Sequence, residues 1–514
     1  MTTDPSPLRQ LGPMELWSSS RHSLGIYRAV TVSARYVPSS RPLTSPIISV
    51  SPRFLAALAS VVRAHPMLRV GIVGEETNAA RYTHLAHVNL LEHVVVVAVA
   101  PATAASEDAL DQEVTRVQAA QHNARWEDTP TRAPWRLTIV RDDRHDCEDV
   151  IFSFHHALLD GTGGRRFHEH LLGALNAALA DEDDHVLSFP EAPVLPEPQE
   201  EAVAFTLGPL YIASVLWGEF APAMLKPAPQ AVWGGERISF ARPYVTRIRA
   251  VDVPPAQTAT LLSACRAQDT TLTGLLHALA FAYFTRALPG DAVPPGGGFR
   301  SATPMGLHRY TRDTVDASLR DTLRVLLCST DHVFTAADVA AMRAADVAAM
   351  RAAALVGRSG GADDALTPAV WATARRVRHE LVERGRTLTH NNVASMMRHV
   401  RDWRGFHTAR DGTARPSSWE CSNVGVLAAE TKETATDKRK EAAGVKVTRV
   451  MFSNGAMVTG AAVAMNVASA PGERLTIALS WQEGVVEESL VDGLGTALEG
   501  MVQRFCKGGS WTLE

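Results

Sequence analysis

An acidic, proline-rich segment, DEDDHVLSFPEAPVLPEPQEEA at residues 181–202, divides the chain and limits how it can fold. The segment has no apolar period, which is typical of a linker rather than of a helix or a buried strand. The chain has 514 residues, and this length is too great for a single hydrophobic core. We therefore expect two domains or three, with the second half of the chain beginning near residue 230.

Both halves alternate between patterns typical of strands and patterns typical of helices. The run VVVVAVA at 94–100 is apolar throughout, so we expect a strand buried on both faces. The sequence predicts an α/β or α+β protein with mixed sheets and two similar lobes. The elements expected are strands at 24–36, 94–100, 135–143, 146–156, 244–253, 299–305, 419–427, 448–455, 461–469 and 474–482, and helices at 51–64, 107–122, 163–180, 256–268, 271–288, 363–385, 387–402 and 487–505.

Charge and cysteine content exclude several classes of protein. The 51 basic and 55 acidic residues give a net charge of −4, so no nucleic-acid partner is expected. The five cysteines are scattered without a CxxC pair, which argues against a disulfide framework and against a structural zinc site and favours a reducing compartment. The N-terminus does not read as a signal peptide, and no run is long enough to span a bilayer. We expect a soluble, cytoplasmic monomer.

The segment FSFHHALLDGTGG at 152–164 carries the strongest chemical signal. A buried strand ends at His155 and His156, and a glycine-rich turn with Asp160 and Gly161 leads into a long helix. A histidine held rigidly at a strand end can face a cleft, where its neutral imidazole removes a proton from a hydroxyl or thiol near pH 7. Asp160 can fix the turn by accepting from backbone groups or by pairing with an arginine.

The segment HHALLDGTGGRRFHEHLL resembles the active-site region of the fungal alcohol acetyltransferase family. That family is part of the superfamily of chloramphenicol acetyltransferase, the plant BAHD acyltransferases and the condensation domains of peptide synthetases. Further segments resemble the family's landmarks in order, namely LGPMELWSSSRHSLGIYRAVTVSARY at 11–36, AHPMLRVGI at 64–72, SNVG at 422–425 and LTIALSWQEGVV at 475–486. The late DFGWG motif of BAHD enzymes is absent, because the corresponding region reads FSNGAMVTG.

The resemblance implies two chloramphenicol-acetyltransferase-like lobes that form a pseudo-dimer around a central channel. The lobes would comprise residues 1–200 and 231–514, with a linker or crossover at 201–230. His156 would be the general base and Asp160 the structural acid, supported by His155, by Gly161 and by Arg69, which would pair with Asp160. Tyr27 and Asn423 are candidates for binding the substrate. His308 and Arg309 occupy the neighbourhood where relatives often carry an arginine, which puts that arginine's contact in doubt.

The implied activity is acyl transfer from acyl-CoA, and by resemblance from acetyl-CoA, to the hydroxyl of a small alcohol, with a secondary metabolite such as a terpenoid favoured. The reaction would proceed in one step through a ternary complex, with no bound cofactor and no metal. Two alternatives stay open. One is a condensation-type enzyme that uses a carrier-protein thioester or an amine acceptor, and the other is a non-catalytic binding protein on the same fold.

Three other patterns carry less weight. The GxSxG match at 357–361 follows an alanine-rich helix rather than a strand, so a nucleophile elbow is not expected. His168 and His170 lie two apart on a helix and point to different sides, which disfavours a metal site. The stretch GTGGRR after the strand at 146–156 lacks the third glycine of a dinucleotide-binding fingerprint.

Overall fold

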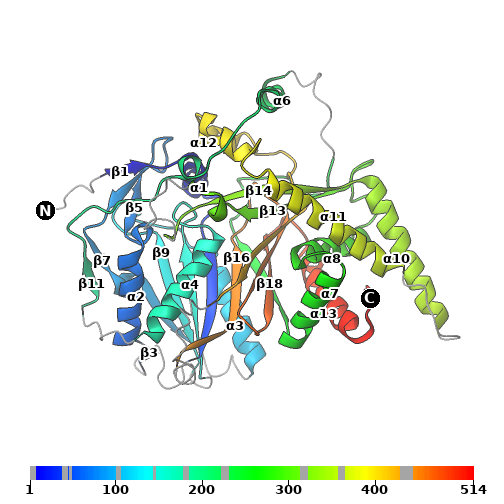
Figure 1. Cartoon of the computed structure of the whole chain (residues 1–514), viewed down its shortest axis with the longest axis horizontal. Coiled ribbons are helices and arrows are strands. Elements are labelled where there is room, and N and C mark those ends of the chain that lie inside the picture. The colour runs from blue at the N-terminus through cyan, green and yellow to red at the C-terminus, as the bar shows by residue number, and fades with distance from the viewer. Residues whose placement is uncertain are drawn as a thin grey trace.

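The strands of the chain form two large mixed sheets that lie side by side (Figure 1). The computed structural model describes residues 7–37, 44–45, 49–99, 106–142, 146–177, 184–221, 231–312, 322–356, 365–428 and 444–513. The blue and cyan part of the chain surrounds the first sheet, and the green to red part surrounds the second. The predicted fold class, with strands and helices in mixed sheets, is confirmed.

The first sheet has the strand order β16–β2–β10–β9–β8. Its pairs are antiparallel except for β8 and β9, which run parallel. Every residue of β10 is buried, as expected for a strand at the centre of a sheet. The strands are β16 (Lys446–Asn454), β2 (Val30–Val37), β10 (Glu148–Phe154), β9 (Trp135–Arg141) and β8 (Val94–Ala98).

Three helices pack against the first sheet. α2 (Pro52–Ala64) lies on α4 (Gly161–Asn176), which contacts β2, and α3 (Glu107–Asn123) contacts β2, β10 and the second sheet. The predicted start of α2 is confirmed, because the Ser51 side chain accepts the Phe54 backbone N–H at 3.2 Å, with proline in the first turn.

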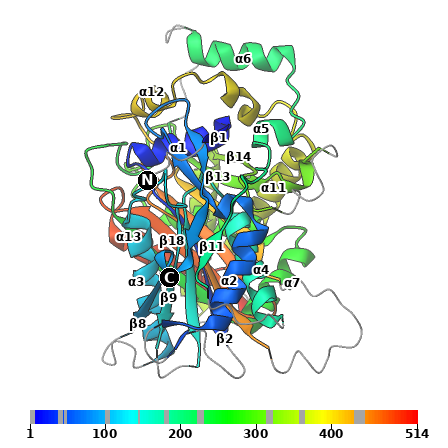
Figure 2. The ribbon, with the colours of Figure 1, turned by 90° about the vertical axis from the view of Figure 1, so that its left-hand side faces the viewer.

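The second sheet has the order β12–β18–β17–β15–β13–β14, with helices on its outer side (Figure 1), and it lies behind the first sheet in the view of Figure 2. Its largest buried aromatic side chains include Trp419 and Phe281. The strands are β12 (Thr246–Val253), β18 (Leu475–Gln482), β17 (Val463–Ser469), β15 (Trp419–Val426), β13 (Phe299–Gly306) and β14 (Leu327–Phe334). The helices are α7 (Pro255–Ala267), α8 (Leu272–Ala287), α10 (Ala336–Val356), α11 (Leu366–Arg386) and α13 (Glu488–Gly508).

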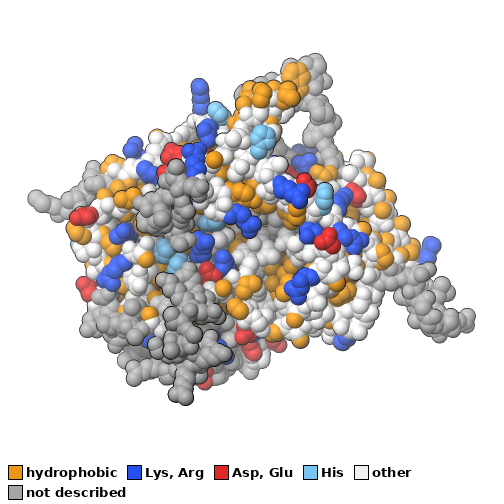
Figure 3. Space-filling model, viewed as in Figure 1, with side chains coloured by type: hydrophobic (Ala, Val, Ile, Leu, Met, Phe, Trp, Pro, Cys, Tyr) orange, Lys and Arg blue, Asp and Glu red, His pale blue; other side chains and the backbone are white. Residues whose placement is uncertain are grey.

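Shorter elements complete the described chain. They are β1 (Pro7–Gln10), α1 (Pro13–Ser23), β3 (Thr44–Ser45), β4 (Ser49–Val50), η1 (Pro66–Leu68), β5 (Val70–Val73), β6 (Arg81–His84), β7 (His87–Asn89), η2 (Leu90–Glu92), β11 (Val186–Ser188), α5 (Gln199–Ala202), α6 (Pro209–Phe220), η4 (His308–Tyr310), η5 (Val393–His399) and α12 (Trp403–Thr408). α6 stands clear of the body, with Leu210 85% exposed, and hydrophobic side chains cover it in Figure 3. Within the described ranges, no helix combines the length and apolar character needed to cross a membrane.

Three expectations from the sequence need correction. The strand at 94–98 is not buried on both faces, because it is the edge of its sheet and Val95 is 53% exposed. The segment 181–202 is not a free linker: β11 pairs with β7, and α5 follows. A single helix over 387–402 is replaced by the 3₁₀ helix η5. The GxSxG match and the tip of the charged loop at 431–443 lie outside the described residues.

The division into lobes at 201–230 stays a prediction, but one strand crosses it. β16 belongs to the segment 231–514 and pairs with β2 in the first sheet, where Phe452 joins the core of the N-terminal half. Backbone pairing between such distant segments depends on the whole topology, so local sequence patterns could not predict that β16 pairs with β2.

A buried ion pair joins the two sheets at this strand. Arg449 of β16 is 1% exposed and donates through Nη2 to Asp252 of β12 at 2.8 Å and through Nε at 3.3 Å. Asp252 also accepts the Thr476 hydroxyl at 2.6 Å. Because Arg449 cannot lose its charge, removing the Asp252 carboxylate leaves this cation in a largely dehydrated site with the longer contact to Asp111 Oδ1, at 3.8 Å.

We therefore expect Asp252→Asn to lower the free energy of unfolding by about 2 kcal/mol, below the range for a fully buried pair because the Asp252 side chain is 24% exposed. Chemical denaturation measures this change. Glu483→Gln is the control, because its pair with Arg247 joins side chains that are 48% and 50% exposed. It should cost less than about 1 kcal/mol. Equal losses in the two variants would contradict a buried pair between the sheets.

Candidate active site

The loop 155–160 connects the central strand β10 to helix α4. Asp160 is the N-cap of this helix, with extended backbone, and its Oδ1 accepts the Gly163 N–H at 2.8 Å. This bond satisfies one of the free N–H groups at the helix start. The loop is therefore held at one end by the sheet and at the other by the helix.

Two glycines of the motif are needed because other chain segments approach them closely. A Cβ at Gly164 would lie 2.7 Å from Phe154 and 2.8 Å from Val32, both in the packed sheet. A Cβ at Gly161 would lie 2.8 Å from Val424 of β15. The glycines therefore let the start of α4 contact both sheets at once.

His156 is held in one tautomer by its own loop. Its Nδ1 lies 2.9 Å from the carbonyl oxygen of Leu159. A carbonyl oxygen only accepts, so Nδ1 carries the proton and Nε2 carries the lone pair. Burial, assisted by the charge of Arg21, lowers the pKa of His156 to about 4. The imidazole is therefore neutral near pH 7 and can accept a proton at Nε2.

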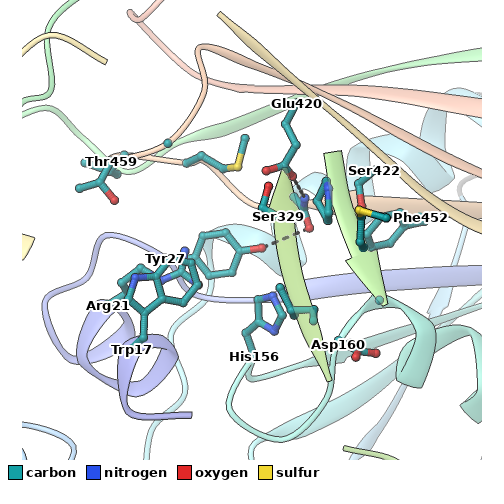
Figure 4. A pocket seen from close by; sticks show the side chains of 18 of the residues that line it. Trp17, Arg21, Tyr27, His156, Asp160, Ser329, Glu420, Ser422, Phe452 and Thr459 are labelled. Atoms are coloured by element: carbon teal, nitrogen blue, oxygen red, sulfur yellow. Dashed lines mark hydrogen bonds between the residues drawn. The ribbon is translucent and has the colours of Figure 1, made fainter. Parts of the chain in front are cut away.

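His156 faces a cavity of about 310 Å³ that both sheets help to line. Trp17 and Tyr27 come from the N-terminal segment, whereas Glu420 and Asn423 come from β15. Figure 4 shows His156 on one side of this space and Glu420 on the other. The cavity lies where the first sheet meets the second, which is where the resemblance implied a channel.

The two predicted substrate-binding residues both line this cavity. The ring of Tyr27 lies 5.8 Å from that of His156, and its hydroxyl donates to Asn454 Oδ1 at 3.2 Å. Asn423 donates to the Thr273 hydroxyl at 3.2 Å. The structure thus brings Tyr27, Asn423 and His156 together, although their roles toward a substrate stay predictions.

The expected pairing of Asp160 with Arg69 is wrong. Arg69 places its guanidinium over the ring of Phe189 at 4.5 Å. Asp160 Oδ2 instead lies 3.2 Å from His308 Nε2 and accepts the Leu326 N–H at 2.9 Å. His308 follows β13, so it reaches Asp160 from the second sheet, whereas Arg69 packs within the N-terminal half.

The Asp160 carboxylate is held ionised by these contacts. Burial alone would raise the pKa of Asp160, but His308 and the N–H groups of Gly163 and Leu326 lower it. Asp160 therefore cross-links the loop of His156 to the chain between β13 and β14.

His155 points away from the cavity into a buried polar cluster. Its Nδ1 accepts the Ala157 N–H at 2.9 Å, so the proton of the neutral ring is on Nε2, which lies 3.0 Å from Glu75 Oε1. Glu75 also accepts from Ser19 at 3.0 Å and contacts His22 Nδ1 at 3.0 Å. Although burial would raise the pKa of Glu75, the two histidines lower it. The cluster ties α1 to the end of β10.

The positions of His22, Glu75 and His155 would suit a metal ion by distance, but their hydrogen bonds do not. His155 Nε2 must carry a proton because Nδ1 accepts a backbone N–H. The same holds for His22 Nδ1, because the Trp126 N–H points to its Nε2 at 3.3 Å. Both rings thus offer N–H groups to Glu75 rather than lone pairs to a cation.

Sequence reasoning missed several residues at this site. Trp17 and Arg21 line the cavity from α1, and Glu420 and Asn454 line it from β15 and β16. No local pattern distinguishes Glu75 from Glu76, because only the folded chain places Glu75 against two histidines. His308 is the exception, since the sequence places it beside Arg309 where relatives often carry an arginine.

Known proteins are similar in sequence to the region that forms this site. The model of the family described as alcohol acetyltransferase matches residues 107–309, which include the loop of His156. "Probable alcohol acetyltransferase FCK4" of Fusarium pseudograminearum is 27% identical over 512 residues, covering 96% of this chain and 94% of that protein. The chain is thus similar to an alcohol acetyltransferase over almost its whole length. The predicted resemblance and the predicted enzyme class, an O-acyltransferase, are confirmed.

A second protein is similar in sequence, and two solved structures share the fold. "Probable alcohol acetyltransferase crmB" of Aspergillus fumigatus is 23% identical over 498 residues, covering 93% of this chain and 96% of that protein. The TRI3 trichothecene 15-O-acetyltransferase of Fusarium sporotrichioides shares the fold with a TM-score of 0.64 at 13% identity, covering 96% and 95% of the two chains. A condensation domain of the monacolin K polyketide synthase MokA follows with a TM-score of 0.57 at 12% identity, covering 99% and 100%.

The contacts of Asp160 predict which partner it needs. We expect a double-mutant cycle of Asp160→Asn with His308→Ala to give a coupling energy of about 1 kcal/mol in thermal or chemical unfolding. The same cycle with Arg69→Ala should be additive. Because the folded pKa of Asp160 is lowered, its contribution is complete above about pH 4 and is lost as the pH falls through the folded value. Coupling to Arg69 rather than His308 would contradict the observed contacts.

Proposed function

We propose that this chain transfers an acetyl group from acetyl-CoA to the hydroxyl of a secondary-metabolite alcohol, with His156 as the general base. The observation that carries this proposal is the protonation and orientation of the His156 ring. Its Nδ1–H is bonded to Leu159, and its Nε2 is open to a cavity lined by both sheets. A neutral imidazole at such a point is suited to deprotonate a hydroxyl.

The proposed transfer is direct, from thioester to alcohol within one ternary complex, and passes through a tetrahedral oxyanion without an acyl-enzyme. As the alcohol oxygen attacks the thioester carbonyl, its proton moves to His156 Nε2, and the carbonyl π electrons move to oxygen to give a tetrahedral oxyanion. Collapse of this oxyanion re-forms the carbonyl and breaks the C–S bond. The proton on His156 passes to the departing thiolate, so ester and CoA thiol leave and the imidazole is again neutral.

The choice of donor and acceptor has two supports. The names of the two sequence relatives describe alcohol acetyltransferases, which favours acetyl as the acyl group and an alcohol as the acceptor. The cavity combines apolar walls, such as Ile26, Met305 and Phe452, with a few polar groups, which fits a largely apolar alcohol.

A condensation-type reaction with a carrier-protein thioester is the second candidate, favoured by the fold shared with a condensation domain. One assay separates the candidates. Acetyl-CoA and an acetyl thioester on a phosphopantetheine carrier protein are offered in parallel with a panel of alcohols and amines, and mass spectrometry detects the product. Turnover from the carrier alone would reject the CoA-dependent proposal, and no product from either donor would favour a binding protein.

We expect His156→Ala to lower the turnover number by about 10²–10⁴-fold while acetyl-CoA binding persists, because the variant loses only the base. Mass-spectrometric ester formation measures the turnover, and calorimetry measures the binding. His390→Ala serves as a matched control, because His390 is exposed and bonds Thr206 outside the cavity. Near-normal turnover of the His156 variant would reject the mechanism.

The pH profile gives a separate test of the same residue. Because the pKa of His156 is lowered to about 4, the base form is present at all higher pH values. In a Glu420→Gln background, which removes the cavity carboxyl whose pKa burial raises to about 7, activity should rise as the pH increases through about 4 and then stay level through neutral pH. An acid limb with its midpoint near pH 6.5, the value of an unperturbed histidine, would contradict the burial of His156 in this cavity.

Tyr27 and Asn423 are proposed to contact the acceptor. We expect Tyr27→Ala and Asn423→Ala to change the Michaelis constant for the alcohol, or the choice of alcohol, more than the Michaelis constant for acetyl-CoA. Steady-state kinetics with each substrate varied in turn measures both constants. Larger effects on acetyl-CoA would move these residues to the donor side of the cavity.

A further inference from the structure

Glu420 places a carboxyl group inside the cavity, across from His156 (Figure 4). Its neighbour Trp419 points to the other face of β15 and is buried in the core of the second sheet. One carboxyl oxygen, Oε1, accepts the Asn454 Nδ2–H at 3.1 Å. Within the described part of the chain, no Lys, Arg or His nitrogen pairs with this carboxyl within 4.0 Å. The second oxygen, Oε2, is thus available to a hydrogen-bonding group of a ligand.

Arg21 faces the same cavity but does not neutralise Glu420. Its guanidinium carbon lies 3.4 Å from the ring centre of Trp17 and 4.3 Å from that of Tyr27, so two aromatic rings hold it. Burial raises the pKa of Glu420 to about 7, and the charge of Arg21 and the Asn454 bond only partly oppose this rise. A carboxyl oxygen without a donor, in a cavity with apolar walls, is unfavourable until a ligand supplies one.

The position of Glu420 is fixed relative to the reacting centre. The Tyr27 hydroxyl donates to Asn454 Oδ1, which directs the Asn454 amide N–H toward Glu420. The Tyr27 ring also packs 5.8 Å from that of His156. The cavity therefore presents two fixed atoms from different walls that can accept a hydrogen bond, His156 Nε2 and, in the ionised carboxylate, Glu420 Oε2.

We propose that Glu420 binds a second hydrogen-bond donor of the acceptor alcohol, a hydroxyl or N–H group, while His156 deprotonates the reacting hydroxyl. This inference rests on the proposed function and assigns the acceptor class as diols or amino alcohols rather than simple alcohols. The pantetheine arm of the acyl donor also carries N–H and hydroxyl groups, so the test separates the two sources.

The test uses pairs of acceptors that differ by one donor hydrogen. Each pair contains a cyclic or terpenoid diol, such as trans-1,4-cyclohexanediol, and its mono-O-methyl ether, offered with acetyl-CoA to the full chain. For each pair whose diol is acetylated, we expect kcat/KM to be about 10–100-fold higher for the diol than for its ether. The ether offers no hydrogen-bond donor to Oε2. The Michaelis constant for acetyl-CoA should change less than twofold in the Glu420 variants.

Two substitutions then locate the effect. In Glu420→Gln, the amide oxygen of residue 420 still accepts the Asn454 N–H. The new NH₂ group then takes the place of Oε2 in the cavity and offers a donor instead of an acceptor. The preference for the diol should therefore fall at least tenfold. Glu420→Ala should abolish the preference. Glu483→Gln, an exposed Glu-to-Gln change, should retain it, and a thermal melt shows whether each variant is folded.

The outcomes distinguish this inference from the function beneath it. If esters form but diols and ethers react equally, or if both Glu420 variants keep the diol preference, the role of Glu420 is wrong while the acyltransferase proposal stands. If the variants chiefly raise the Michaelis constant for acetyl-CoA, Glu420 binds the donor, and the acceptor assignment is overturned. If no ester forms with any acceptor, both proposals fail.

Discussion

The Asp160 carboxylate is the contact on which the arrangement of this site depends. Its Oδ1 starts α4 by accepting the Gly163 N–H, and its Oδ2 reaches His308 and the Leu326 N–H in the other half of the molecule. One side chain therefore fixes the loop that carries His156 both to α4 and to the chain between β13 and β14. Because the cavity opens between the two sheets, a shift of either would move the base relative to the opposite wall.

The two adjacent histidines show how this loop divides its tasks. His156 bonds to its own loop through Nδ1 and leaves Nε2 to the cavity, whereas His155 points away from the cavity and places Nε2 3.0 Å from Glu75 Oε1. Glu75 also holds Ser19 and His22 of α1, the helix that carries Trp17 to the cavity wall. The buried cluster thus positions the strand end and the cavity wall together.

Local patterns in the sequence were sufficient for the elements and for the centre of the site. The Ser51 cap, the apolar run before His155 and the turn at Asp160, whose Oδ1 accepts the Gly163 N–H, act through neighbours in the chain, so their structure could be predicted. Partners that come from distant segments could not. The place of β16 beside β2 depends on the whole topology, and the pairing of Asp160 with His308 rather than Arg69 depends on which side chain reaches across the sheets.

Burial acts in opposite directions on the two titratable groups that face each other in the cavity. It lowers the pKa of His156 to about 4 and raises that of Glu420 to about 7, because in each case the charged form loses hydration. Arg21, held between two rings, disfavours a charged His156 and favours a charged Glu420. A substrate that enters therefore meets a neutral base and a carboxyl poised between its two forms. Acyl transfer requires the neutral base, and the carboxyl oxygen that the protein leaves unpaired requires a donor on the substrate.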